Sequence, residues 1–168
     1  GKENNIKASF LGYDKRIDKV EHKPVDITDK LVVTVSSQKG CPMNCNFCDC
    51  PKLGFKGNAT LPELITEIMS GVALSGIKHG QRLNVHYARM GEPTFNPNVI
   101  VSAKHIAQIF GDPNSDITFE EYHPVVSTMM PKSNKNLENF IQKWVETGFK
   151  YGGEDGFGLQ FSINTLDE

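Results

Sequence analysis

The sequence has little net charge and no long apolar segment. Its formal net charge is −2 over 168 residues, so nothing attracts the whole molecule to nucleic acid or to an anionic membrane, and any such partner would need a local patch. No segment approaches the roughly 20 apolar residues that a membrane helix needs, and the polar residues 1–5 lack the apolar core of a signal peptide. We therefore expect a cytoplasmic protein without a membrane partner.

Cysteine is absent outside one short window, and the sequence has neither internal repeats nor low-complexity segments. All four cysteines, Cys41, Cys45, Cys48 and Cys50, lie within one stretch of ten residues. Disulfides that stabilise secreted domains close longer loops, because the entropy that they remove from the unfolded chain grows with loop length. The clustering therefore argues against a disulfide framework.

The chain is long enough to bury one sizeable core, and we expect a single domain. Residues 1–30 are polar and weakly patterned, so we interpret them as an N-terminal extension that precedes a core at residues 31–168. The core opens with a β-branched run at residues 31–36, which predicts a buried parallel strand.

Predicted strands and helices alternate through this core. Thr60 supplies an N-cap, with Pro62 and Glu63 in the first turn, for a helix that ends near Gly76. The further predicted elements are strands at 83–87, 123–128 and 158–164, helices at about 97–110 and 136–147, and loops at 38–58 and 90–96. This alternation predicts an α/β fold with a parallel sheet, about four strand–helix units, and functional loops at the carboxyl ends of the strands. Since an exposed parallel edge is normally covered, we expect the rest of the sheet to come from a longer protein or from another chain.

Cys41, Cys45 and Cys48 form a C-x3-C-x2-C pattern in the loop after the first predicted strand. Three thiolates on a short loop can hold three irons of a [4Fe–4S] cube and leave the fourth iron open for a chelating ligand, whereas electron-transfer ferredoxins use four cysteines. A zinc site with Cys50 as the fourth thiolate is the alternative, although structural zinc sites usually pair two separate C-x2-C turns. We interpret Cys50 as a bystander thiol, with cluster repair or substrate contact left open.

The similarity to a known family extends beyond the cysteines. Residues 35–41 (VSSQKGC), 54–58 (GFKGN) and 90–93 (MGEP) resemble the radical S-adenosylmethionine superfamily, and most of all its branch of RNA adenine methyltransferases. The resemblance covers residues 31–100 well and residues 120–166 more weakly. It implies that the chain is the front part of a parallel (β/α) barrel of the radical S-adenosylmethionine type.

The resemblance also implies the cofactors and the reaction. Cys41, Cys45 and Cys48 would hold a [4Fe–4S] cluster, and S-adenosyl-L-methionine would bind at the open iron. Reductive cleavage would yield methionine and a 5′-deoxyadenosyl radical that abstracts hydrogen from a substrate, while the protein positions the cofactor. The implied partners are a reductant such as flavodoxin or ferredoxin and an RNA substrate. There are two alternative hypotheses. The first is a radical enzyme that acts on a peptide, a nucleotide or another small substrate. The second is a binding module that zinc or a cluster stabilises.

Further positions are assigned to S-adenosylmethionine by the resemblance alone. The family's Gly-Glu pair falls on Gly91 and Glu92, and glycine permits close approach of the backbone to a ligand. A strand-end serine falls on Ser127, and a triplet at the fourth strand falls on Ser162, Ile163 and Asn164.

One position departs from the family. The methylating enzymes carry a cysteine in the first strand, seven positions before the first cluster ligand, and this chain has Thr34 there. A threonine hydroxyl cannot form a disulfide, so we expect that RNA is not methylated by the family's two-cysteine route.

Other candidate residues carry weaker signals. Lys52 and Lys56 would suit a phosphate near the cysteines, but solvated loop lysines explain them as well. The histidines are scattered without ligand spacing, which favours structural roles for His79, His86, His105 and His123. We expect Trp144, with Phe140 and Ile141, to form the core face of a helix.

Overall fold

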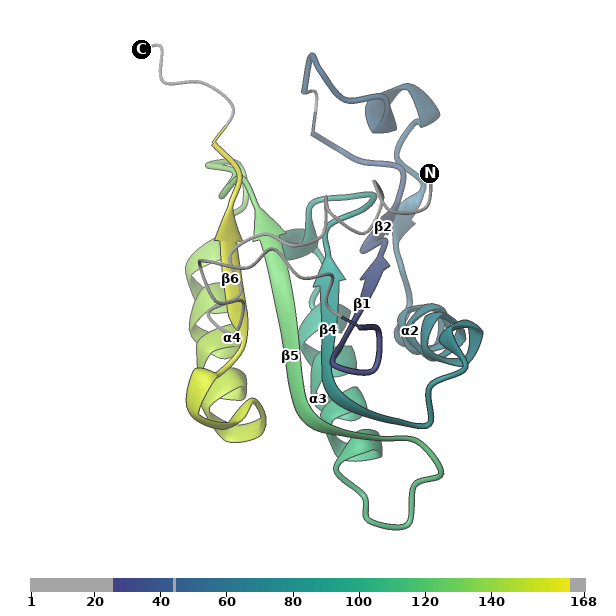
Figure 1. The fold of residues 1–168 in the computed structure, drawn as a ribbon. Coiled ribbons are helices and arrows are strands. Elements are labelled where there is room, and N and C mark those ends of the chain that lie inside the picture. The colour runs from purple at the N-terminus through teal and green to yellow at the C-terminus, as the bar shows by residue number, and fades with distance from the viewer. Residues whose placement is uncertain (1–25, 44, 164–168) are drawn as a thin grey trace, which may run out of the picture.

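The computed structural model describes residues 26–43 and 45–163, and its centre is a four-stranded parallel sheet (Figure 1). The strands, in spatial order, are β1 (Lys30–Val35), β4 (His79–Tyr87), β5 (Thr118–Thr128) and β6 (Gly158–Phe161). Every neighbouring pair is parallel. The helices α2 (Leu61–Ser75), α3 (Asn98–Phe110) and α4 (Leu137–Tyr151) connect successive strands. The predicted α/β fold with a parallel sheet is confirmed, and the strands in the described part of the chain form an open sheet rather than a closed barrel.

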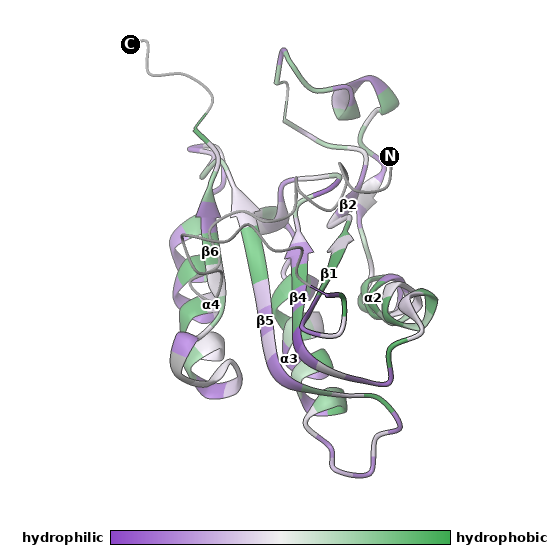
Figure 2. Ribbon diagram, viewed as in Figure 1, coloured by the Kyte–Doolittle hydropathy of each residue, from purple (hydrophilic) through white to green (hydrophobic). Residues whose placement is uncertain are grey.

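The hydrophobic core lies between the sheet and the three helices. Alternate residues of β1, such as Val33 and Val35, are buried, and so are Leu83, Val85 and Tyr87 of β4. Figure 2 shows the apolar residues along α2, α3 and the middle of β5. The period of two in the strands therefore separates a face packed on helices from a more polar face.

Trp144 anchors α4 in this core, as its sequence context predicts. Its side chain is fully buried, its ring meets Tyr87 edge to face, and its Nε1 donates a hydrogen bond to the carbonyl of Gly158 at 3.0 Å. Phe140 is also buried and stacks against the same ring.

Helix α2 begins and ends as the sequence predicts. Thr60 and Glu63 form a capping box, in which the Thr60 hydroxyl accepts from Glu63 N and the Glu63 carboxylate accepts from Thr60 N. The helix ends at Gly76, which adopts a left-handed conformation with a φ of 72°. Glu63 also pairs with Lys39 at 2.6 Å, so the start of α2 is tied to the loop that follows β1.

Several predicted boundaries are wrong. Strands β4 and β5 begin four and five residues earlier than expected, because their first residues are mostly polar and only Phe119 among them is a buried apolar residue. Helix α4 extends to Tyr151, and β6 stops at Phe161. The predicted loop 38–58 holds an antiparallel ribbon of β2 (Gln38–Lys39) and β3 (Gly57–Asn58) and a 3₁₀ turn, η1 (Cys50–Leu53). Three strand–helix units and a fourth strand are present where about four units were expected.

The proposed N-terminal extension, residues 1–30, lies mostly outside the described residues. Residues 26–29 form a turn that leads into β1. None of the helices in the described ranges has the length and apolar character that a membrane crossing requires.

Candidate functional site

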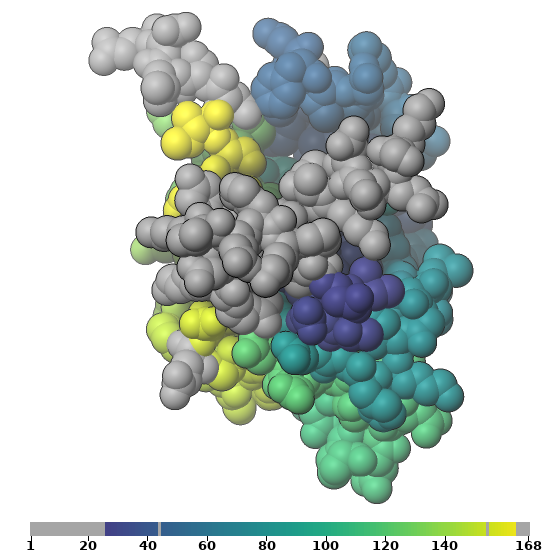
Figure 3. All heavy atoms as spheres, in the orientation of Figure 1, coloured from purple at the N-terminus to yellow at the C-terminus, as the bar shows by residue number. Residues whose placement is uncertain are grey.

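The cysteines lie at the carboxyl edge of the sheet, where segments that follow or end β1, β4, β5 and β6 meet. The cysteine loop, residues 40–56 between β2 and β3, projects at the top of the molecule in the space-filling view (Figure 3). A cavity of about 180 Å³ lies beneath it. Seven of the residues singled out in the sequence line this cavity: Cys41, Cys45, Cys48, Gly91, Glu92, Ser127 and Ser162.

The two ends of the cysteine loop are joined by the β2–β3 ribbon. Lys56 N donates to the carbonyl of Lys39 at 2.8 Å, and Gln38 Nε2 donates to Asn58 Oδ1 at 2.7 Å. Gly40 has a φ of 80°, and a Cβ there would lie 1.7 Å from the carbonyl oxygen of Gly54. Only glycine lets these two strands of the loop approach so closely.

The residues that precede the cysteine loop are hydrogen-bonded to the glutamate loop, residues 88–97 after β4. Gln38 is almost fully buried, its N donates to the carbonyl of Met90 at 3.1 Å, and its Oε1 accepts from Glu92 N at 2.9 Å. Asn96 Nδ2 donates to the carbonyls of Ser37 and Ala59. These buried groups are all paired, so the two loops form one rigid unit.

Gly91 is required by the packing of these loops. Its φ is 100°, and a Cβ would lie 2.6 Å from Gln38 Cβ and 2.8 Å from Ser37 Oγ. The sequence pointed to close approach of a cofactor as the reason for this glycine. The close contact with Ser37 and Gln38, which precede the cysteine loop, is a second and independent reason.

The carboxylate of Glu92 joins the glutamate loop to the end of β5. It is 4% exposed and accepts hydrogen bonds from Thr94 Oγ1 at 2.8 Å, Thr128 Oγ1 at 2.6 Å and Met129 N at 3.2 Å. Asn134 Nδ2 adds a link from the next loop to the carbonyl of Thr94 at 2.9 Å. This clamp was not visible in the sequence, because its members lie far apart in the chain.

The thiols are close enough to influence one another. Burial, followed by the charges of Cys41, Cys48 and Glu92, raises the pKa of the Cys45 thiol. Burial and an interaction with the Cys48 side chain raise the pKa of Cys50, which lines the same cavity rather than standing apart from it. Ionising several neighbouring thiols requires a compensating positive centre, which bound metal supplies.

In the described residues, no group of three His, Cys, Asp or Glu side chains is arranged to hold a metal ion. A single zinc ion needs its thiolates at about 2.3 Å, whereas a cube takes one thiolate at each of three separate irons.

Of the four further positions that the resemblance assigns to S-adenosylmethionine, two line the cavity. Ser127 lies at the end of β5, where its hydroxyl donates to Gln160 Oε1 at 2.8 Å, and Ser162 follows β6. Both line the cavity. Ile163 is 74% exposed and is absent from the lining, and Asn164 lies outside the described residues.

The sequence analysis did not predict two sulfur contacts and one cation near the cavity. Met90 Sδ accepts from Gly40 N at 2.9 Å, and Met129 Sδ lies 3.7 Å from Cys45 Sγ. Arg89 lines the cavity. Of these three residues, only Met90 and Arg89 could have been predicted to lie near the cavity, since they immediately precede the Gly91–Glu92 pair in the chain.

The remaining candidates lie away from the cavity. Lys56 is exposed, and Lys52 is paired with Asp49. His79 and His105 are exposed, as a structural role on a strand or helix surface allows.

His86 and His123 are partly buried on β4 and β5. Burial is the first cause that lowers the pKa of each imidazole. His86 Nε2 and His123 Nδ1 are buried without a hydrogen-bond partner in the described structure.

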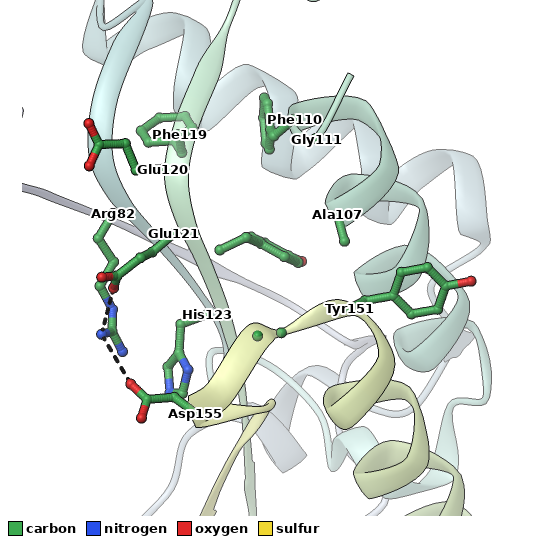
Figure 4. A pocket seen from close by; sticks show the side chains of 13 residues that line it. Arg82, Ala107, Phe110, Gly111, Phe119, Glu120, Glu121, His123, Tyr151 and Asp155 are labelled. Atoms are coloured by element: carbon green, nitrogen blue, oxygen red, sulfur yellow. Dashed lines mark hydrogen bonds and ion pairs between the residues drawn. The ribbon is translucent and has the colours of Figure 1, made fainter. Parts of the chain in front are cut away.

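A second, larger cavity of about 410 Å³ lies at the opposite, amino edge of the strands (Figure 4). Its polar wall contains Arg82, which pairs with Glu121 at 3.1 Å and with Asp155 at 3.8 Å. Its apolar wall contains Phe119 and Tyr151. No cysteine lines it, so we assign the candidate site to the smaller cavity.

Three of the curated proteins that the chain is similar to are named as RNA methyltransferases. The chain is 32% identical over 111 residues to the probable dual-specificity RNA methyltransferase RlmN of Synechococcus sp. (strain JA-2-3B'a(2-13)). It is 39% identical over 87 residues to the dual-specificity RNA methyltransferase RlmN of Aliarcobacter butzleri, and 31% identical over 108 residues to that of Wolinella succinogenes. The chain resembles the RlmN RNA methyltransferases. The predicted resemblance is thereby confirmed.

The similarity to RlmN is partial on both sides. The three matches cover 66%, 52% and 60% of this chain, but only 29%, 24% and 30% of the relatives. The chain thus spans less than a third of the length of the curated relatives that it matches. No family model matches the chain, and no solved structure matches it.

Proposed function

We propose that this chain forms the cluster- and cofactor-binding part of a radical S-adenosylmethionine enzyme. The observation that carries the proposal is the convergence of Cys41, Cys45 and Cys48 on one cavity at the carboxyl edge of a parallel sheet. In open α/β sheets, this edge is where ligands bind.

The three cysteines would hold a [4Fe–4S] cluster, and S-adenosylmethionine would occupy the cavity beside it. When bound, the two cofactors supply a 5′-deoxyadenosyl radical that removes hydrogen from a substrate. Gly91 presents main chain to the methionine part of the cofactor. The hydroxyls of Ser127 and Ser162 face the same cavity and are suited to the ribose or the carboxylate, with Ile163 and Asn164 next in the chain.

By analogy with the named function of its relatives, the whole protein would be a methyltransferase-like radical enzyme with RNA as a candidate substrate. We further propose a cytoplasmic enzyme that receives electrons from flavodoxin or ferredoxin. The rest of the barrel would come from further chain or from another chain.

Thr34 favours a second candidate reaction. It is half-buried on β1 in register with His86, and a hydroxyl replaces the thiol that the resemblance predicts there. Without that thiol, the two-cysteine route to methyl transfer is closed. The second candidate is therefore a radical enzyme that uses the same cofactors on a peptide, a nucleotide or another small substrate.

Anaerobic reconstitution tests the cofactor assignment. We expect about four irons and four sulfides per chain, and 5′-deoxyadenosine on addition of dithionite and S-adenosylmethionine. Stoichiometric zinc without sulfide would instead support the structural-module alternative.

Methyl-labelled S-adenosylmethionine and total RNA separate the two reactions in the full-length protein. We expect 5′-deoxyadenosine without efficient label transfer to adenine. Transfer that depends on Cys50 would restore the methyltransferase assignment.

A further inference from the structure

Arg89 is a charged residue in the candidate site to which neither the motif nor the resemblance gives a role. It follows Ala88 after β4 and lines the cavity with Cys41, Cys45 and Cys48. Its guanidinium forms no ion pair or side-chain hydrogen bond with any other residue that the structure describes.

The cations around it behave differently. Lys39 pairs with Glu63 at 2.6 Å, and Lys52 pairs with Asp49. Arg82, at the opposite edge of the sheet, pairs with Glu121. Arg89 alone among these four lines the cysteine cavity, and among the four it is the one without a carboxylate partner in residues 26–43 and 45–163.

The main chain around Arg89 is held against the cysteine loop. Arg89 N donates to the carbonyl of Val35 at 3.2 Å, and the next residue, Met90, accepts from Gln38 N at 3.1 Å and from Gly40 N through its Sδ at 2.9 Å. Gly40 directly precedes Cys41. The guanidinium is therefore carried on a backbone whose position relative to the first cluster ligand is fixed.

Arg89 is the only lysine or arginine among the described residues that line the cavity. The buried carboxylate of Glu92 lies in the same wall. A ligand carboxylate beside the open iron of the cluster would therefore find in Arg89 the one side chain whose charge attracts it. A guanidinium suits that role because its fork of donors matches a carboxylate with two parallel hydrogen bonds.

We propose that Arg89 binds the carboxylate of S-adenosylmethionine. The inference rests on the proposed function, since it assumes that S-adenosylmethionine occupies this cavity. It adds a residue that selects for the amino-acid part of the cofactor.

The test is anaerobic titration calorimetry on cluster-loaded full chain with two ligands. S-adenosylmethionine carries the carboxylate, and 5′-methylthioadenosine keeps the adenosine and sulfur but lacks the amino acid. Arg89→Ala should raise the Kd for S-adenosylmethionine roughly tenfold and leave that for 5′-methylthioadenosine unchanged. Arg89→Lys should show a smaller rise, because it keeps the charge but loses the fork. Lys56→Ala is the matched control: it removes an exposed cation from the neighbouring cysteine loop, outside the cavity lining, and should change neither Kd.

Two outcomes would overturn the inference alone. These are an unchanged Kd for S-adenosylmethionine in Arg89→Ala and an equal rise in Kd for both ligands. Iron content is measured for each variant, and a loss of iron in both Arg89→Ala and Arg89→Lys would mean that the residue shapes the cysteine loop instead. If the unaltered chain loads its cluster but binds no S-adenosylmethionine, the proposed function fails and the inference fails with it.

Discussion

Two cavities of this molecule lie at opposite edges of the same sheet and differ in what their polar groups do. In the larger one, at the amino edge, Arg82 pairs with both Glu121 and Asp155 (Figure 4). The smaller one, at the carboxyl edge, is lined by the thiols and by Arg89, whose guanidinium has no partner among the described residues. Volume alone would select the amino-edge cavity, which no cysteine lines.

The difference follows from how each edge is built. The amino-edge cavity lies where α3 and α4 end against the first half of β5, and its lining includes Phe110 and Phe119, whose rings meet edge to face. At the carboxyl edge, a buried polar network fixes three loops while leaving reactive groups at the surface of the cavity. A binding site requires rigid support beneath its reactive groups. Substitutions at the carboxyl edge should therefore change cofactor binding, whereas substitutions at the amino edge should not.

The largest expected effect is the loss of the cluster. Replacing Cys41, Cys45 or Cys48 with alanine should abolish cluster binding, because each would supply the only protein ligand to one iron. The measurement is iron and sulfide content, together with visible absorption, after anaerobic reconstitution.

Two variants serve as controls for the cysteine prediction. Cys50→Ala should keep the cluster, and so should Arg82→Gln at the amino edge, since neither residue is assigned to an iron. Full cluster occupancy in Cys45→Ala would sink the cluster assignment.

Removal of the Glu92 carboxylate should have the next largest effect. Glu92→Ala would leave the buried hydroxyls of Thr94 and Thr128 and the N–H of Met129 without their acceptor. We expect a loss of about 3 kcal/mol in the free energy of unfolding, measured by urea denaturation. Glu92→Gln, which keeps one acceptor oxygen, should lose less, and a change below about 0.5 kcal/mol in Glu92→Ala would show that the clamp is not needed.

Gly91→Ala should cost less stability but should disturb the site more widely. The new Cβ meets Gln38 and Ser37, and the backbone φ of 100° is unfavourable for alanine, so we expect about 2 kcal/mol of destabilisation. Because Gln38 supports the cysteine loop, cluster loading should fall together with S-adenosylmethionine affinity. Normal iron content with weakened cofactor binding would indicate instead that the glycine serves only the ligand.

Much of this arrangement could be predicted from local sequence signals. The cap at Thr60, the β-branched run in β1 and the core position of Trp144 depend on neighbours in the chain, and all three predictions are confirmed. The gathering of the cysteines, Gly91 and Ser127 at one edge follows from parallel topology.

Contacts between distant segments could not be predicted in the same way. The Glu92 clamp joins residues 36 positions apart, and Gln38 meets Glu92 across 54 positions. The first residues of β4 and β5 were missed because most of them are polar, as in a loop, and the buried Phe119 is an isolated apolar residue there. The space that Gly91 leaves for Gln38 has no sequence signature beyond the glycine itself.

The smallest expected effect concerns the ion pair that ties α2 to the cysteine loop. The hydrogen bond from Lys39, followed by those from Thr60, lowers the pKa of the Glu63 carboxyl from 4.5 to about 2. Because the folded-state pKa is lower than the unfolded one, the carboxylate's contribution to stability is present above pH 4.5 and is lost as the pH falls from 4.5 toward 2. Both partners are about half exposed, so solvent screening keeps the contribution small.

Glu63→Gln should therefore lower the free energy of unfolding slightly at pH 6 and flatten its decline between pH 4.5 and 2.5, as followed by urea denaturation at each pH. Glu138→Gln, in the first turn of α4, is the matched control. An equal flattening in both variants would mean that the pairing of Glu63 with Lys39 does not stabilise the link between α2 and the cysteine loop.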